Sequence, residues 1–262
     1  PLPTPSTEMP RVRGENPVLA PAAQRTGVTV EAHVARNLYA IWGGAVSSDM
    51  LEWYRKEFGC ATKHEAERSS GDWDTLMSQA AASPPGAHGV MFLPHLSGGG
   101  CPTVDPRSLG GFVGLSNLAT KGDLLRAVIE GLDYQFLDIV KTLRHDLGVP
   151  FERLIVVGGA TKNRFWLQNK ADMVGALFGL PIEAPAVDEA TPLGAAMLAG
   201  IGVGLYRNEE DAFAQVRKPS VIYEPNPEAA GVYARLFPIY QHLYPALSAI
   251  SHELSASGAM SC

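Results

Sequence analysis

The chain has 262 residues, of which 46% are hydrophobic and 18% are charged, and its formal net charge is −6. This composition is typical of a globular protein with a substantial core, and it excludes a disordered chain. The acidic balance argues against nucleic acid or an anionic membrane surface as the main partner.

Several features favour the reducing cytoplasm as the location of the protein. No stretch of about 18 apolar residues is present, so we expect no transmembrane helix and no membrane partner. The first residues, Pro1 to Pro5, contain neither a basic nor an apolar segment, so we expect no signal peptide. The cysteines, Cys60, Cys101 and Cys262, are widely spaced and match neither a zinc site nor a disulfide framework.

Apolar periodicity and turn residues divide the chain into helices and strands. Residues 1–26 are rich in proline and predict an irregular lead-in to one globular domain over 27–262. The first expected elements are strands at 28–30 and 38–42, helices at 47–58 and 72–82, and strands at 90–93 and 111–115.

A helix over 121–147 has the clearest signal. Thr120 and Asp123 predict a capping box, although Glu or Gln usually stands at the second position, and Gly148 and Pro150 predict the end of the helix. The later expected elements are strands at 153–157 and 181–184 and helices at 163–178, 191–204 and 230–255. Strands that alternate with helices in this way indicate an α/β domain.

The most informative segment is the end of the strand at 153–157, where the paired glycines Gly158 and Gly159 precede a helix that begins near Asn163. A strand that turns through glycine into a helix places free backbone amides and the positive end of the helix dipole beside the turn. Phosphates and nucleotides bind at such places. Glycine pairs also make ordinary tight turns, so this signal alone is weak.

Other segments contain residue types that are found in sites, but we expect them to be structural. The helix at 191–204 is almost wholly small and apolar, which predicts tight packing in the core, since glycine in a helix costs roughly 1 kcal/mol relative to alanine. The glycine-rich loop at 97–102 lacks the ending of a phosphate loop, so we expect a flexible connection between strands. His95 has no second histidine at a ligand spacing, and we expect Asp105 and Asp188 to form turns.

Three segments resemble, in order, the signatures of the C-terminal domain of the FGGY family of carbohydrate kinases, most nearly its xylulokinase-like members. They are Gly110–Leu115 followed by Asp123–Glu130, Val157–Asn163 continuing through Asp172, and Glu189–Ala196. The resemblance implies an actin-like, ribonuclease-H-like ATPase fold with two domains around a cleft. It also implies that this chain is the C-terminal, nucleotide-binding half.

The resemblance implies which residues bind ATP or ADP. In the family, the paired-glycine turn contacts the adenosine and the asparagine after it contacts the base. This correspondence gives Gly158, Gly159, Ala160 and Asn163 as nucleotide-binding residues.

A second nucleotide-binding segment of the family corresponds to a helix earlier in this chain. It gives Ser48, where the family commonly has glycine, and Glu52, which stands one residue before Trp53. The glycine-rich loop differs from the family in a similar way, because many members have Gly-Glu-Arg-Thr-Pro where this chain has Gly-Gly-Gly-Cys-Pro.

The resemblance implies phosphorylation of a sugar or polyol hydroxyl by ATP and Mg²⁺, with a ketopentose such as xylulose or ribulose as the expected substrate. The family's catalytic aspartate and its sugar-binding N-terminal domain lie upstream of anything in this chain, so we assign no catalytic residue and expect the isolated chain to be inactive. A homodimer is a further expectation, since family members often pair. The alternative is a non-catalytic interaction domain that retains the kinase fold.

Overall fold

The computed structural model describes residues 26–34, 38–45, 48–59, 72–187 and 189–257. The predicted lead-in lies outside the described residues except for Thr26, and so do Asp188 and the side chain of Ser48. Among the helices of the described ranges, none has both the length and the apolar character needed to span a membrane.

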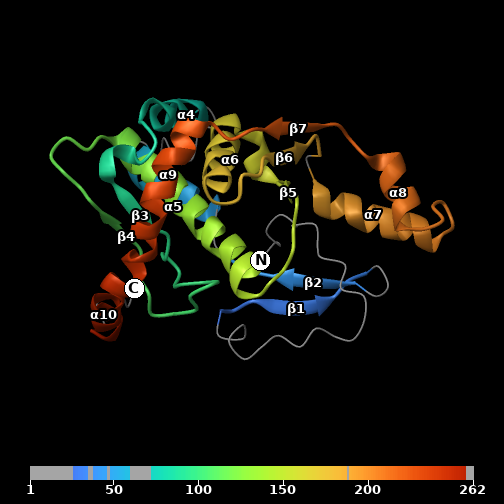
Figure 1. The fold of residues 1–262 in the computed structure, drawn as a ribbon, viewed down its shortest axis with the longest axis horizontal. Coiled ribbons are helices and arrows are strands. Elements are labelled where there is room, and N and C mark those ends of the chain that lie inside the picture. The colour runs from blue at the N-terminus through green and yellow to red at the C-terminus, as the bar shows by residue number, and fades with distance from the viewer. Residues whose placement is uncertain (1–25, 35–37, 46–47, 60–71, 188, 258–262) are drawn as a thin grey trace.

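Helices and short strands alternate along the described chain (Figure 1). The strands are β1 (Thr29–Ala32), β2 (Tyr39–Trp42), β3 (Met91–Leu93), β4 (Gly111–Val113), β5 (Leu154–Ile155), β6 (Ile182–Pro185) and β7 (Ser220–Tyr223). The α-helices are α2 (Ser48–Tyr54), α4 (Asp72–Ala82), α5 (Lys121–Lys141), α6 (Arg164–Phe178), α7 (Ala190–Gly202), α8 (Glu209–Val216), α9 (Pro227–Gln241) and α10 (Leu243–Ala256). Turns of 3-10 helix at 87–89 and 159–162 and of π-helix at 55–59 and 142–146 complete the described elements.

The described strands form three small sheets. β1 pairs antiparallel with β2, and β3 pairs antiparallel with β4. In the third sheet β6 is central: it is parallel to β5, with Leu154 opposite Ile182, and antiparallel to β7. Parallel strands need a crossover connection, and α6 supplies it. The glycine turn therefore lies at the carboxyl end of β5, where the chain enters α6.

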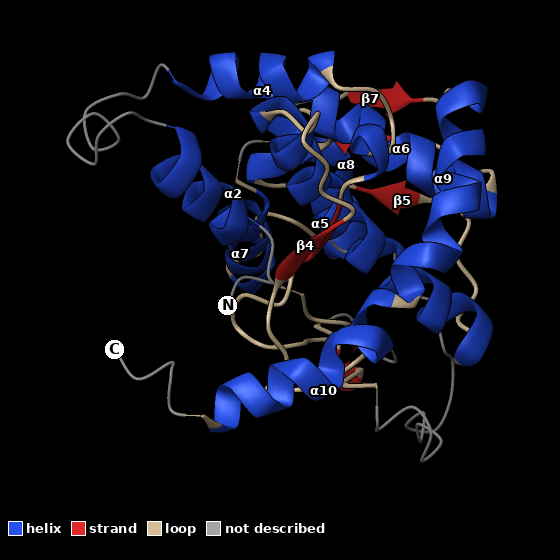
Figure 2. Cartoon of the chain, turned by 90° about the vertical axis from the view of Figure 1, so that its left-hand side faces the viewer, coloured by secondary structure: helices blue, strands red, loops and turns tan. Residues whose placement is uncertain are grey.

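Helix α5 is the central support of the molecule, and most of its residues are buried (Figure 1). One hydrophobic cluster packs α5 against β3, β5, β6, α6 and α9, and it includes the aromatic pair Tyr134 and Tyr240, whose ring centroids lie 4.9 Å apart. A second cluster packs α5 against α2 and α4, which lie on the same side of the molecule in Figure 2. These two clusters hold α6, and hence the turn before it, against a rigid support.

The start of α5 is the capping box that the sequence predicts. The backbone N–H of Asp123 donates to Thr120 Oγ1 at 3.2 Å, and Asp123 Oδ2 accepts from the Thr120 backbone N–H at 2.9 Å. The α-helix ends at Lys141 rather than Leu147, because the last turn continues as π-helix before Gly148, whose φ is +65°.

The prediction that residues 191–204 pack tightly in the core is wrong. Helix α7 forms there, but Gly200 is its only buried residue, and Leu198 is 41% exposed. After β6 the chain extends outward as α7 and folds back as α8 (Figure 1). An apolar sequence predicts burial only where a partner surface exists, and the described part of the chain covers little of this helix.

Three further differences concern the last third of the chain. The sequence did not predict α8 or β7, both of which are short and largely exposed. The single helix expected at 230–255 is wrong, because α9 and α10 are separated at His242. Pro245 explains the break: it has no N–H to donate to the carbonyl of Gln241, and its ring would clash with that carbonyl in a continuous helix.

Candidate functional site

The predicted glycine turn has a backbone conformation that requires glycine. Gly158 has φ +86° and ψ −165°, a region that is essentially restricted to this residue. The backbone N–H and the hydroxyl of Thr161 both donate to the Gly158 carbonyl, at 3.0 and 2.7 Å. A single 3-10 turn follows, and Asn163 then caps α6. The turn is therefore held in one shape by its own hydrogen bonds.

The turn faces open space. A methyl group added at Gly158 or Gly159 would meet no heavy atom of the described residues within 4 Å, whereas one added at Gly131 would lie 2.4 Å from the Phe92 carbonyl oxygen. The backbone N–H groups of Gly159 and Ala160 donate to no group among the described residues. Two amides and the positive end of the α6 dipole thus face an accessible space, an arrangement that suits an anion or a nucleotide.

The side chain of Asn163 is oriented by its capping role. Its Oδ1 accepts from the Trp166 backbone N–H at 3.1 Å, an N-cap bond of a kind that typically stabilises a helix by about 1 kcal/mol. The other end of the amide, Nδ2, donates to none of the described residues. Asn163 therefore presents two free donor hydrogens beside the open turn.

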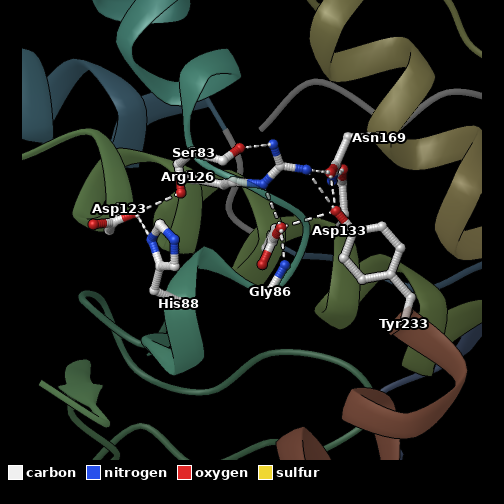
Figure 3. A network of polar contacts seen from close by, with 9 residues as sticks. Ser83, Gly86, His88, Asp123, Arg126, Asp133, Asn169 and Tyr233 are labelled. Atoms are coloured by element: carbon white, nitrogen blue, oxygen red, sulfur yellow. Dashed lines mark hydrogen bonds and ion pairs between the residues drawn. The ribbon is translucent and has the colours of Figure 1, made fainter. Parts of the chain in front are cut away.

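A buried polar network joins α5, α6 and α9 (Figure 3). Arg126 donates to Glu130 at 2.7 Å and to the Tyr233 hydroxyl at 2.9 Å, and Glu130 accepts from the Gly86 backbone N–H at 2.9 Å. Burial raises the pKa of Glu130, although the charge and hydrogen bonds of Arg126 act in the opposite direction. The Tyr233 hydroxyl also donates to Asn169 on α6, so this network supports α6 from one side.

The second predicted segment lies on α2. Ser48 is the first residue of this helix, and Glu52 is half-exposed. Arg55 binds both oxygens of Glu52, at 2.9 and 2.7 Å, and this hydrogen bonding lowers the pKa of Glu52. Helix α2 and Ala160 border the same hydrophobic cluster, but no hydrogen bond or ion pair of the described residues joins Glu52 to the turn.

The described side chains offer no dedicated metal site. Within the described ranges, no group of three or more His, Cys, Asp or Glu residues could hold a metal ion. Mg²⁺ commonly retains several water ligands and is bound through one or two carboxylates together with nucleotide phosphates. The described residues thus fit an ion that arrives with a nucleotide, not one held by the protein alone.

His95 and Asp105 make side-chain hydrogen bonds, and Asp105 Oδ1 also accepts from the Arg107 backbone N–H at 3.0 Å, which fits the predicted turn. His95 Nδ1 lies 2.6 Å from Ser108 Oγ, and burial lowers the pKa of His95. Asp105 accepts from the Tyr244 hydroxyl at 3.0 Å and lies 2.6 Å from His252 Nε2, and its backbone pairs with Gly99, so it ties the glycine-rich loop to α10. That loop connects β3 to β4 as expected, while Asp188 lies outside the described residues.

Comparisons with known proteins find relatives over most of the chain. The family described as the FGGY family of carbohydrate kinases, C-terminal domain, matches residues 8–203. A xylulose kinase from Staphylococcus epidermidis is 33% identical over 182 residues, which make up 70% of this chain and 36% of that protein. A glycerol kinase from Ralstonia nicotianae is 34% identical over 207 residues, or 79% of this chain and 37% of that protein.

A solved structure agrees with these sequence matches. The ligand-bound xylulose kinase from Lactobacillus acidophilus superposes with a TM-score of 0.73 and 25% identity, over 90% of this chain and 45% of that one. The chain therefore spans less than half the length of these relatives. The predicted α/β fold class is confirmed, since the match is to half of a sugar kinase.

Proposed function

Because the chain belongs to the FGGY family of carbohydrate kinases and has the actin-like ATPase fold of its C-terminal domain, we propose that it supplies the nucleotide-binding half of an ATP-dependent sugar or polyol kinase. The observation that carries this proposal is the open turn at the start of α6. Its two unengaged amides and the free Nδ2 of Asn163 are the donors that a nucleotide requires.

Each residue of the turn has a separate role in this proposal. Gly158 gives the backbone its left-handed bend, and Gly159 leaves room for the adenosine. The amides of Gly159 and Ala160 donate to the ligand, and Asn163 donates from Nδ2 to a ring nitrogen of the base. Mg²⁺, bound with the nucleotide, would offset the charge of the phosphates.

We assign Ser48 and Glu52 to the second nucleotide-binding segment. Helix α2 borders the same hydrophobic cluster as Ala160, which supports a shared site. Glu52 already forms ion pairs with Arg55 and Lys56. Its carboxylate would therefore contact a ligand only through these two cations, or after they have released it. The local charge near Glu52 is therefore not strongly negative, which favours a bound nucleotide.

The acceptor and the catalytic base belong to the rest of the kinase in this proposal. A carboxylate from polypeptide that the longer relatives possess would take the proton of the acceptor hydroxyl, and closure of two domains would exclude water. Matches to xylulose and glycerol kinases support a small polyol or ketose, and a ketopentose such as xylulose is our first candidate. The isolated chain should then bind nucleotide without transferring phosphate.

The second candidate function is a non-catalytic interaction domain. The specific observation in its favour is α7, an apolar helix whose Leu198 is 41% exposed. An exposed apolar surface of this kind is typical of contact with another polypeptide. The two candidates differ in one measurable property, which is affinity for a nucleotide.

Calorimetric titration of the purified chain with Mg-ADP tests the proposal. Gly159→Val should weaken binding at least tenfold, because the branched side chain would fill the space proposed for adenosine. Gly202→Val is the matched control: Gly202 also has no heavy atom within 4 Å of an added methyl group, and it lies at the end of α7. No heat at millimolar Mg-ADP, or equal affinity of the Gly159→Val chain, would favour the interaction domain.

A further inference from the structure

We infer that Asp133 is a positioning residue for the nucleotide turn: a buried carboxylate of α5 that orients the first turns of α6 and, through Trp166, the amide of Asn163. This inference deepens the proposed function and rests on it. Asp133 lies 30 residues before Asn163 along the chain, outside every segment that resembles a nucleotide-binding motif.

Asp133 receives three directional bonds from a single helix. Its exposed fraction is 0%, and its Oδ1 accepts from the Trp166 indole Nε1 at 2.9 Å and from Lys170 Nζ at 2.5 Å. Its Oδ2 accepts from Asn169 Nδ2 at 2.8 Å. The three donors come from the first two turns of α6, so one carboxylate defines the rotation of this helix about its own axis.

Trp166 transmits this orientation to the turn. Its indole is anchored to Asp133, while its backbone N–H donates to Asn163 Oδ1 at 3.1 Å. The indole is buried in the cluster that also includes Ala160 at its border. A Trp166 side chain without an acceptor would have to shift to satisfy its N–H, and its backbone would carry the Asn163 amide with it.

The energetics favour an orienting role over a simple contribution to stability. The Lys170 side chain is 10% exposed, and its ammonium lies 4.4 Å from the centre of the Phe136 ring. Replacing such a buried ion pair by apolar residues of similar volume is often neutral or stabilising, because both charges lose their hydration. Apolar residues, however, offer no acceptor that would fix the orientation of the Trp166 indole N–H.

Asp172, a buried carboxylate on α6 itself, provides a comparison. Asp172 accepts from Gln168 Nε2 at 2.8 Å and from the Asn226 backbone N–H at 2.7 Å, which ties α6 to the start of α9. None of its bonds reaches Asn163 or Trp166. Asp172→Asn should therefore perturb a buried carboxylate on α6, the helix that Asp133 orients, without disturbing the turn.

The experiment compares two double variants that both lack the ion pair. Asp133→Asn with Lys170→Met keeps a carbonyl oxygen for the Trp166 indole but no acceptor for Asn169, whereas Asp133→Leu with Lys170→Met has nearly the same shape and no acceptor for either donor. By calorimetry with Mg-ADP, the Asn form should bind within twofold of the unmodified chain. The Leu form should bind about tenfold more weakly than the Asn form, because the two differ by one buried hydrogen bond, that of the Trp166 indole.

A spectroscopic measurement separates orientation from stability. The indole N–H resonance of Trp166, assigned with the Trp166→Phe variant, should shift on addition of Mg-ADP to the unmodified chain and to the Asp172→Asn control. A purely structural Asp133 would leave this resonance insensitive to the nucleotide. If the Leu form does not fold, Trp166→Phe removes the same bond from the other side and should show the same tenfold loss.

The outcomes distinguish this inference from the function on which it rests. If the unmodified chain binds no Mg-ADP, the proposed function fails and the inference fails with it. If the unmodified chain binds and either the Asp133→Leu form or Trp166→Phe binds equally well, the positioning role is overturned while nucleotide binding stands. A loss of affinity as large in Asp172→Asn would also overturn it, because the effect would then be general to α6.

Discussion

The two glycines of the turn before α6 serve different purposes, although they are adjacent in the sequence. Gly158 adopts a φ of +86°, a conformation that residues with a side chain disfavour. Gly159 has no positive φ, and a methyl group added to it would meet none of the described residues within 4 Å. Gly158 is thus required by the fold. Gly159 is required only if a ligand occupies the space before it.

This difference predicts effects of different size on stability for the same substitution. Gly158→Ala should lower the free energy of unfolding by about 1–3 kcal/mol, the cost of a residue held in an unfavourable backbone region. Gly159→Ala should change it by less than about 0.5 kcal/mol, since it is a surface substitution without strain. Urea denaturation of both variants measures the difference, and equal destabilisation would contradict it.

At the residue scale, the sequence predicts the glycine turn but not the Asp133–Trp166 contact that supports it. A strand, two glycines and an asparagine at the start of a helix are local features, so Gly158, Gly159 and Asn163 could be selected from the pattern. Asp133 and Trp166 are 33 residues apart and meet only because α5 packs on α6. The one available signal was an aspartate among the apolar residues of α5, which a pattern alone cannot pair with its partner.

Among the elements, α5 has the most strongly specified start. Its Asp123 carboxylate receives hydrogen bonds from Ser83, Thr120 and His88, with the Ser83 hydroxyl at 2.6 Å. Burial alone would raise the pKa of Asp123, but these hydrogen bonds outweigh it and hold the pKa far below the ordinary value of 3.8. The charged form of Asp123 is therefore favoured by folding.

The stability that Asp123 contributes should depend on pH in one direction. The unfolded carboxyl takes up its proton near pH 3.8 and the folded one only at lower pH, so the contribution is complete above about pH 5 and is lost as the pH falls toward the folded pKa. Asp123→Asn should cost about 1–2 kcal/mol at pH 7, and the difference should shrink at pH 3. Urea unfolding at both pH values tests this, with exposed Asp74→Asn as the control.

Element boundaries were predictable where a local stop signal exists. The end of the 72–82 helix and the start of α5 agree with the sequence pattern, because Ser83 and Pro84 follow the first and a capping box precedes the second. The break at His242 was missed, although Pro245 carries the signal. Strand β7 was missed for a different reason: Ser220–Tyr223 has no alternation of buried and exposed residues, and β6 alone pairs with it.

At the scale of the whole molecule, α7 is an apolar helix whose side chains are largely exposed in this chain. A helix without a charged residue is expected in a core, yet Leu198 is 41% and Leu205, just beyond its end, 67% exposed. The curated relatives are more than twice as long as the segment that this chain matches. Both observations are explained if α7 packs against polypeptide beyond the described residues.

The exposed surface of α7 should make the isolated chain associate with itself. We expect sedimentation velocity to show association that increases with concentration, and Leu198→Gln with Leu205→Gln to reduce it. The thermal midpoint should change little, because both side chains are already exposed.

A core substitution is the control. Leu167 is only 1% exposed, so Leu167→Ala should cost about 2–5 kcal/mol of stability and leave the association unchanged. Association that survives the double substitution would show that another surface causes it, and α7 would then need a different explanation.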